Sequence, residues 1–383
     1  FLIQMALFAA GVATIIQTVG FGKVGSRLPI IQGTSFAFIP IMLPFKAFGL
    51  GAIFTAAFIG GIFQIWIGKM LKPIRHMFPP LVTGIVVLMI GISLLKVGFK
   101  YAGGGVWLMN NKPEIFGNWE HLLIAGTVLI VALLCNLRGK GMVSSASILI
   151  GIIAGFVMAT LLGEVRFEKI AAAGWFAFPM PFQYGIDFVW GAVILMLFMS
   201  VVTTIETIGD ISATTMGGAN REATDKELSG GIMADGVGTA FASIFNAMPN
   251  TSYSQNAGLV AFTGVISRHV GTVAGVILIL LGLFPKLGGI IAAMPDSVIG
   301  GAAIIMFGLI AGAGIKLISK TEMSQRNILI LALSLSFGIG LYAFPEFVAH
   351  IPDFGIKLKL LLTTGLIPAG LLAFILNATL PKK

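Results

Sequence analysis

The chain has 383 residues, of which 57% are hydrophobic and only 10% charged, and its mean hydropathy is +1.00. Because soluble domains carry about 25% charged residues, this composition excludes a soluble fold and is typical of a polytopic membrane protein. The net charge of +9 comes from lysines and arginines scattered through short connections, which follows the charge pattern around membrane spans and argues against a nucleic-acid-binding face.

Apolar stretches in chain order predict the spans, since about 20 apolar residues cross a bilayer as a helix. The stretches are 1–19, 50–68, 80–98, 121–137, 144–162, 188–213, 270–293, 296–318, 326–344 and 360–380. Two further regions are irregular: Ile30–Leu43 is too short to span, and Leu228–Ile266 is broken by glycines, Pro249 and a polar run. We expect these regions to add one and two crossings, which makes thirteen spans. Because the chain begins inside an apolar run, we expect a fourteenth span before Phe1.

The two irregular regions resemble each other and predict an internal repeat. Thr34 and Thr251 stand 217 positions apart in similar surroundings, and Pro79 recurs 216 positions later as Pro295. Interrupted segments at matching places in two inverted repeats point to the binding site of a transporter. Non-helical backbone at bilayer depth must line a cavity or be buried in protein. We therefore expect 34–38 and 251–255 to face each other near the midplane, each as a short extended piece that leads into a half-helix.

The basic residues predict the orientation in the membrane. With the crossings above, fifteen of the 24 lysines and arginines fall on one side, which the positive-inside rule places in the cytoplasm. The residues on that side are Lys23, Arg27, Lys69, Lys72, Arg75, Arg138, Lys140, Arg221, Lys226, Arg268, Lys316, Lys320, Arg326, Lys382 and Lys383.

Three acidic residues lie in stretches that read as membrane-buried: Glu206, Asp210 and Asp235. A carboxylate at bilayer depth costs about 3 kcal/mol or more, so these residues are the first candidates for function. Glu206 and Asp210 are four apart and share a helix face; two carboxylates that close in low dielectric do not both ionise readily, so one can carry a proton. The alternatives are that Asp210 caps a helix end and that Asp235 bonds to backbone N–H groups of a glycine-broken helix.

The sequence gives little support for a histidine proton relay, a metal site or a reactive cysteine. No histidine lies mid-span, so a proton relay must use carboxylates, and no residue spacing indicates a metal site. The single cysteine, Cys135, reads as a small buried hydrophobe. We expect no cofactor, with protons as the coupling ion.

The polar run Tyr253-Ser254-Gln255-Asn256 suggests recognition of a flat heterocycle. Gln255 offers a carbonyl and an amide NH₂, whereas an ionised Glu206 only accepts, so together they match a ring with amide edges. Phe36 and Tyr253 could cover its faces. The alternative for Gln255 and Asn256 is capping of the half-helix, which is compatible with binding.

These motifs resemble a known family. The run Gln255-Asn-Ala-Gly258-Leu-Val-Ala-Phe-Thr263-Gly264 is similar to the signature Gln/Glu/Pro-Asn-x-Gly-x-x-x-x-Thr-Arg/Lys/Gly of the nucleobase–ascorbate transporters, also called the nucleobase:cation symporter-2 family. It follows Asn250-Thr-Ser-Tyr, with Glu206-Thr-Ile-Gly-Asp210 and Ala234-Asp235-Gly236 upstream, and Gly33-Thr-Ser-Phe36-Ala-Phe38 resembles the strand in the family's third helix. The resemblance covers essentially the whole chain.

The resemblance implies an all-α, seven-plus-seven inverted-repeat fold of fourteen helices, with short strands in the third and tenth. It implies a core domain of 1–68 (helices 2–4) and 188–293 (helices 8–11). The gate domain would be 69–187 (helices 5–7) and 294–383 (helices 12–14), through which family members commonly dimerise. Glu206 and Gln255 would bind the base, with Phe36, Tyr253, Ser254 and Asn256 around it, while Asp210, Asp235 and Glu206 would serve proton coupling.

The function that follows is proton-coupled symport of an oxidised purine across a bacterial inner membrane, by alternating access. Gln rather than Glu at 255 favours oxidised purines over uracil. Ala257 stands where many purine-transporting members have Asn, which leaves xanthine and uric acid both open. The alternatives are a uracil or other nucleobase permease of the same family, an anion exchanger or channel on the same fold, and, more distantly, a membrane-embedded enzyme that uses Glu206 and Asp210 as an acid pair.

Overall fold

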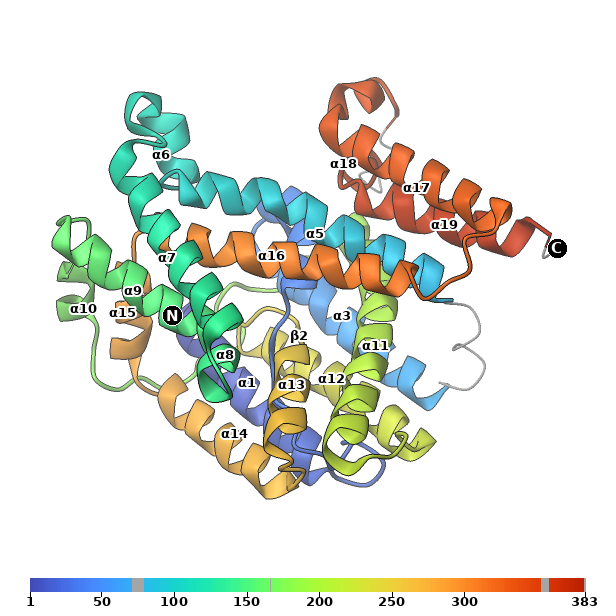
Figure 1. Ribbon diagram of the computed structural model, residues 1–383, viewed down its shortest axis with the longest axis horizontal. Helices are drawn as coiled ribbons and strands as arrows, with labels where there is room; N and C mark the ends of the chain where they lie inside the picture. The colour runs from blue at the N-terminus through green and yellow to red at the C-terminus, as the bar shows by residue number, and fades with distance from the viewer. Residues whose placement is uncertain (71–78, 166, 353–357, 382–383) are drawn as a thin grey trace. The chain divides into compact units, whose positions relative to one another are not determined.

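The computed structural model describes residues 1–70, 79–165, 167–352 and 358–381 (Figure 1). Lys72, Arg75, Lys382 and Lys383, which the orientation prediction uses, lie outside the described residues. Contacts divide the chain into two compact units. Unit 1 comprises 1–89, 177–284 and 314–383, and unit 2 comprises 90–176 and 285–313. The division into core and gate concerns which helices move together, and it stays a prediction.

The fold is mostly helical with two short strands, which confirms the predicted class. Unit 1 contains α1 (Leu2–Val19), β1 (Gln32–Thr34), η1 (Phe36–Phe38), α2 (Ile39–Met42), η2 (Leu43–Phe48), α3 (Leu50–Lys69), α11 (Trp190–Ala219), α12 (Asp225–Ile244), β2 (Asn250–Ser252), α13 (Ser254–Thr263), α14 (Arg268–Gly282), α17 (Gln325–Ala343), η5 (Pro345–Val348), α18 (Leu358–Thr363) and α19 (Leu366–Thr379). Unit 2 contains α6 (Val106–Asn111), η4 (Pro113–Ile115), α7 (Trp119–Arg138), α8 (Met142–Ser145), α9 (Ser147–Leu161), α10 (Glu168–Ala172) and α15 (Pro285–Ala293). The long helices α5 (Pro80–Ala102) and α16 (Asp296–Ile318) contribute to both units.

Within the described residues, seven helices are long and apolar enough to cross a membrane: α1, α3, α5, α7, α11, α16 and α17. The predicted span 270–293 is instead two helices, because α14 ends at Gly282 and α15 begins at Pro285. Pro285 explains the break, because proline has no backbone N–H to continue the helical hydrogen bonds and restrains the residue before it. Shorter apolar helices cover 36–48, 147–161 and 366–379.

The irregular regions meet as a two-stranded antiparallel ribbon. Strand β1 pairs with β2 in the register Gln32 to Ser252, Gly33 to Thr251 and Thr34 to Asn250. The prediction that these segments face each other, each as an extended piece leading into a helical one, is therefore confirmed.

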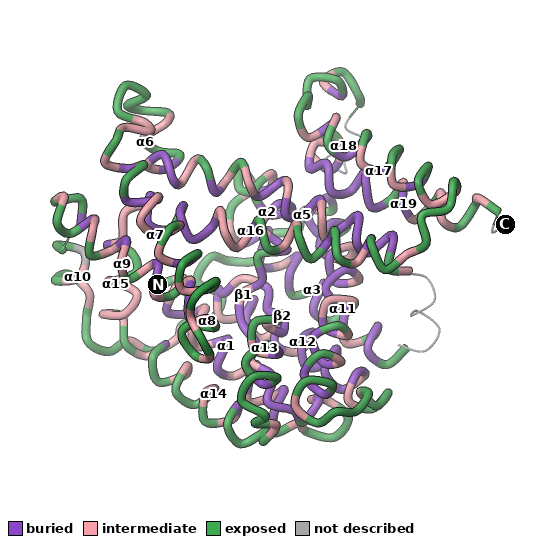
Figure 2. The backbone as a smooth tube through the Cα atoms, in the orientation of Figure 1, coloured by how far each residue is buried: buried purple, intermediate pink, exposed green. Residues whose placement is uncertain are grey.

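Two closely packed helix pairs support the ribbon in unit 1. Helix α1 packs along α14, and α12 packs along α3. Glycine faces glycine at both crossings: a Cβ on Gly11 would lie 2.5 Å from the Gly275 carbonyl, and a Cβ on Gly61 would lie 2.7 Å from the Gly236 carbonyl. Small residues at such crossings let helix backbones approach closely, as is common in membranes. In Figure 2 buried residues are dense around α3, α12 and the strands, whereas α14 is mostly intermediate or exposed apart from its glycines.

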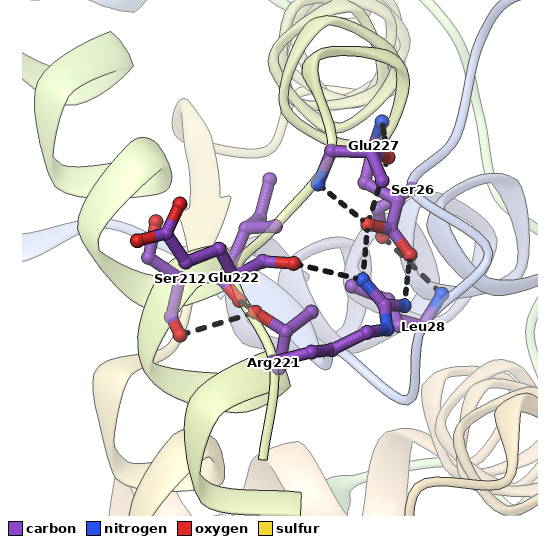
Figure 3. A network of polar contacts seen from close by, with 9 residues as sticks. Ser26, Leu28, Ser212, Arg221, Glu222 and Glu227 are labelled. Atoms are coloured by element: carbon purple, nitrogen blue, oxygen red, sulfur yellow. Dashed lines mark hydrogen bonds and ion pairs between the residues drawn. The ribbon is translucent and has the colours of Figure 1, made fainter. Parts of the chain in front are cut away.

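The connection from α11 to α12 fixes the position of both helices. Helix α11 ends at Ala219, and the residue that follows it, Asn220, has a left-handed φ of 56°. The Arg221 guanidinium then donates to both carboxylate oxygens of Glu227, at 2.9 and 2.6 Å (Figure 3). Thr224 and Glu227 form a capping box at the start of α12. This hydrogen bonding lowers the pKa of Glu227 to about 2.

Unit 2 has its own apolar core. Helix α7 packs against α9, and α10 packs against α15. The buried side chains of this core include Ile124, Val128, Ala159 and Val298. The α7 residues on the opposite face, among them Leu122 and Ile130, are exposed as expected for a lipid-facing surface.

Candidate functional site

Asp235 is the point at which the ribbon joins the long helices. It is fully buried on α12, and both of its carboxylate oxygens accept hydrogen bonds. Oδ1 accepts from Gln32 Nε2 on β1 and from Ser252 Oγ on β2, the latter at 3.1 Å, while Oδ2 accepts from Thr207 Oγ1 on α11. A buried carboxylate needs such partners, because leaving its oxygens unpaired is costly. One acidic group thus ties together both strands and two helices.

Helix α11 brings the other two acids to this point. Glu206 lies one turn before Asp210 and one residue before Thr207, which contacts Asp235. Glu206 is half-buried and Asp210 is only 6% exposed. Glu206 lies close enough to both aspartates to interact electrostatically with them. The three acids predicted from the sequence therefore form one cluster.

The half-helix α13 begins beside this cluster. The Ser254 side chain lies next to the Asp210 carboxyl, and seven residues further along both helices Ala261 lies against Gly217. The equal spacing shows that α13 runs parallel to the second half of α11. Glu206 comes one turn before Asp210 and therefore lies in front of the N-terminus of α13. The first N–H groups of a helix have no intrahelical acceptor and lie at its positive end. Polar N–H donors and carboxylate acceptors thus lie together here.

Three of the predicted site residues reach accessible space at this point. Phe36 is 39% exposed, and Ser254 and Gln255 are exposed on the first turn of α13. Gln255 follows the residue that contacts Asp210. Phe36, Gln255 and the half-buried Glu206 supply an aromatic ring, an amide and a carboxylate from η1, α13 and α11, and both η1 and α13 pack against α11. We call this accessible part of unit 1 the open edge.

Tyr253 and Asn256 also hold the ribbon together. The Tyr253 hydroxyl donates to the Thr34 carbonyl at 3.2 Å, and its ring lies over Gly33. Asn256 Nδ2 donates to the Pro29 carbonyl at 2.5 Å. The side chains of Tyr253 and Asn256 therefore position β1 relative to the start of α13. From the sequence we expected these residues around the substrate and did not foresee this structural role.

Sequence reasoning missed the three residues that bond to Asp235. Gln32 and Thr207 are polar residues within apolar stretches, Ser252 belongs to the polar run that starts at Asn250, and all three are almost fully buried. The available signal was Thr207 itself, which lies between Glu206 and Asp210. Gln32 and Ser252 could be found only from the strand register, which brings them opposite each other.

Comparisons with known proteins show the family of the chain. A family model described as "Permease family" matches residues 1–347. The chain belongs to this family of nucleobase permeases. It is 39% identical over 382 residues to a Clostridium perfringens protein named as a purine permease, which covers 100% of this chain and 82% of that protein.

Further relatives have named purine substrates. The chain is 36% identical over 396 residues to the xanthine permease XanP of Escherichia coli, covering 100% of this chain and 84% of that protein. It is 34% identical over 381 residues to the uric acid permease PucJ of Bacillus subtilis, covering 98% of this chain and 84% of that protein.

Solved structures show the same fold. The transmembrane domain of the cyanobacterial bicarbonate transporter BicA aligns with a TM-score of 0.55 at 16% identity, covering 98% of this chain and 95% of that one. SLC26A9 aligns with a TM-score of 0.61 at 16% identity, covering 87% of this chain and 57% of that one. At this identity the likeness concerns the fold alone.

Proposed function

We propose that this permease imports an oxidised purine base, xanthine or uric acid, together with protons across a bacterial inner membrane. The observation that carries the proposal is the cluster of Glu206, Asp210 and Asp235 at the start of α13. The xanthine and uric acid permeases among its relatives support the substrate class.

The chemistry of the open edge suits such a base. A purine with oxo groups presents several N–H donors and carbonyl acceptors around a flat ring. Glu206 can accept from ring N–H groups, Gln255 can both donate and accept, and the first N–H groups of α13 can donate to a carbonyl. Phe36 supplies a ring face, and stacked aromatic pairs contribute about 0.5–1.5 kcal/mol beyond burial.

Coupling follows from keeping several acids close together in a low-dielectric site. Because repulsion between neighbouring carboxylates opposes full ionisation, a proton on one of them favours the arrangement that binds substrate. Asp210 lies between Glu206 and the Ser254 hydroxyl, and Asp235 lies behind them between the two strands. A proton taken up by Glu206 or Asp210 thus changes the electrostatic field at Asp235, the residue that holds the two strands of the ribbon. We assign no metal ion to this step.

Transport proceeds by alternating access, in which the predicted core (1–68 and 188–293) moves against the predicted gate (69–187 and 294–383). The ribbon, α11, α12 and α13 belong to the core and would carry the substrate. The inverted repeat and a homodimer formed through the gate belong to this proposal. Both are consistent with a multi-pass member of the family.

Uptake by purified protein in proteoliposomes tests the proposal. We expect labelled xanthine or uric acid to accumulate when a proton gradient points inward and to equilibrate without accumulation when the gradient is collapsed. Unlabelled uracil should compete only poorly with this uptake. A Lys112→Gln variant, changed at an exposed residue outside the site, serves as the control. Uptake that ignores the proton gradient would refute coupling, and preference for uracil would favour the alternative nucleobase.

An anion exchanger is the alternative that the shared fold with BicA and SLC26A9 raises. The residues at the open edge argue against it, because Glu206 offers a carboxylate acceptor and the first turn of α13 carries no lysine or arginine, which suits a ring with N–H donors better than a small inorganic anion. Uptake driven by a counter-anion, with no response to protons, would support the exchanger.

A further inference from the structure

We propose that unit 2 carries a binding site for an anionic phospholipid of the surrounding membrane. The site is a cavity of about 470 Å³ formed by α5, α7 and α16 together with the segment that joins α5 to α7. Its lining includes Phe99, Met109, Phe116, Leu122 and Leu129, and the side chains of Lys96 and Lys100 also border it. This volume falls within the range of about 300–1,000 Å³ that is usual for ligand pockets.

The lining fits an acyl chain better than a polar solute. Apart from the two lysines, every side chain that lines the cavity is apolar. Gly126 widens it on the α7 side, since a Cβ at this glycine would meet no atom within 4 Å. Leu122, which lines the cavity, is also 57% exposed on the lipid-facing side of α7. A chain can therefore enter sideways from the bilayer.

The two lysines select the headgroup. Lys96 and Lys100 lie one turn apart in the last part of α5 and therefore share one helix face. Lysine side chains can cover apolar surface with their methylene groups while the ammonium reaches a polar layer. Two ammonium groups at the edge of an apolar cavity complement a phosphodiester attached to an acyl chain.

Exposed tryptophans place this edge at headgroup depth. Trp107 on α6 and Trp119 at the start of α7 are 61% and 64% exposed. They flank the joining segment, which includes the cavity residues Met109, Phe116 and Gly117. Tryptophan gathers at the membrane–water interface, because its ring is apolar and its N–H needs a polar partner. The orientation predicted from the basic residues places this end of α5 in the outer leaflet.

Lipid binding to the purified full-length protein tests the proposal. Native mass spectrometry compares phosphatidylglycerol with phosphatidylcholine carrying the same acyl chains. We expect the anionic lipid to bind more tightly, and Lys96→Gln with Lys100→Gln to weaken its binding about 5- to 30-fold without changing the neutral lipid. The matched control is Lys112→Gln, an exposed lysine of unit 2 outside the cavity. Glycerol 3-phosphate, the soluble headgroup fragment, should not compete.

Filling the cavity provides a second, independent variant. Gly126→Leu should abolish retention of the lipid, whereas Gly288→Leu on α15, where a Cβ also meets open space, should leave it unchanged. Equal binding of both lipids, or a Gly126→Leu protein that retains phosphatidylglycerol, overturns the proposal. Competition by glycerol 3-phosphate would instead assign the lysines to a free anion. Loss of dimers in Gly126→Leu with lipid binding intact would assign the cavity to a second copy of the chain.

Discussion

The two segments that form the ribbon begin alike and then differ. After β1, the Ser35 side chain accepts a hydrogen bond from the Ala37 N–H, and the chain continues as short turns of η1, α2 and η2. After β2, the chain continues as the regular helix α13. Pro40 and Pro44 account for the difference, because each removes a backbone donor from the first segment.

The difference separates two roles. The first segment presents Phe36 and otherwise apolar residues, whereas the second presents Ser254, Gln255 and Asn256 on an ordered first turn. We infer that the first segment shapes and covers the site and that the second distinguishes one substrate from another. Asp235 joins the two segments, because its carboxylate accepts hydrogen bonds from Gln32 on β1 and from Ser252 on β2.

Breaking this joint should have the largest effect. Asp235→Asn keeps an oxygen that can accept from Gln32 and Ser252 but cannot ionise, so we expect the protein to fold and to lose proton-driven accumulation of xanthine. Asp235→Ala leaves the three donors without an acceptor, and we expect it to lower stability by a further ~2–5 kcal/mol. Uptake in proteoliposomes and thermal melting measure the two effects. Accumulation against a gradient by the Asn variant would remove Asp235 from coupling.

Disturbing the ribbon should have the next largest effect. A Cβ on Gly33 would collide with the hydroxyl and ring of Tyr253. We expect Gly33→Ala to cost ~1–3 kcal/mol of stability and to slow uptake. Adding Tyr253→Phe removes the hydroxyl and should restore part of the loss. If Gly33→Ala behaves like the wild-type protein, the contact between Tyr253 and β1 does not define the site.

Substitutions on the first turn of α13 should change selectivity rather than stability. Gln255→Glu replaces a group that donates and accepts with one that only accepts when ionised, so we expect preference to shift from xanthine toward uracil by about 10-fold. The matched change on the first segment, Ser35→Ala, should cost about 1 kcal/mol as a lost cap without altering selectivity. Competition uptake measures both. A selectivity change in Ser35→Ala of the same size would contradict the division of roles.

The smallest effect concerns the connection from α11 to α12 (Figure 3). Because Arg221 lowers the pKa of Glu227 from its ordinary 4.5 to about 2, the ionised side chain stabilises the fold above pH 4.5. This contribution disappears as the pH falls from 4.5 to 2. We therefore expect Glu227→Gln to lower the melting temperature at pH 7 and to converge with the wild-type protein near pH 2. A difference that does not depend on pH would exclude the ion pair as its cause.

Much of the site could be predicted from the sequence, because its acids lie in apolar stretches where a charge is conspicuous. Glu206, Asp210 and Asp235 stood out for this reason, and the polar run at 253–256 stood out beside Pro249. The two extended segments were predicted to face each other because a 14-residue apolar stretch is too short to span a bilayer as a helix and because the second irregular region repeats its pattern. Their pairing as strands was implied by the family resemblance.

The remaining features depend on three-dimensional packing. The bonds from Gln32 and Ser252 to Asp235 need the register of two strands more than 200 residues apart. The break between α14 and α15 interrupts an apolar stretch in which hydropathy alone shows no boundary. The second role of Tyr253 and Asn256, in holding β1, comes from contacts with Thr34 and Pro29 that no local pattern reveals.

Binding and uptake measured together in a Glu206→Gln variant test the central claim most directly. The claim is that one acidic side chain at the start of α13 both accepts from the purine and responds to the proton. We predict that this variant reaches the membrane and melts like the wild-type protein, yet neither binds labelled xanthine or uric acid nor accumulates either base under an inward proton gradient. Full, gradient-driven uptake by Glu206→Gln would contradict the account.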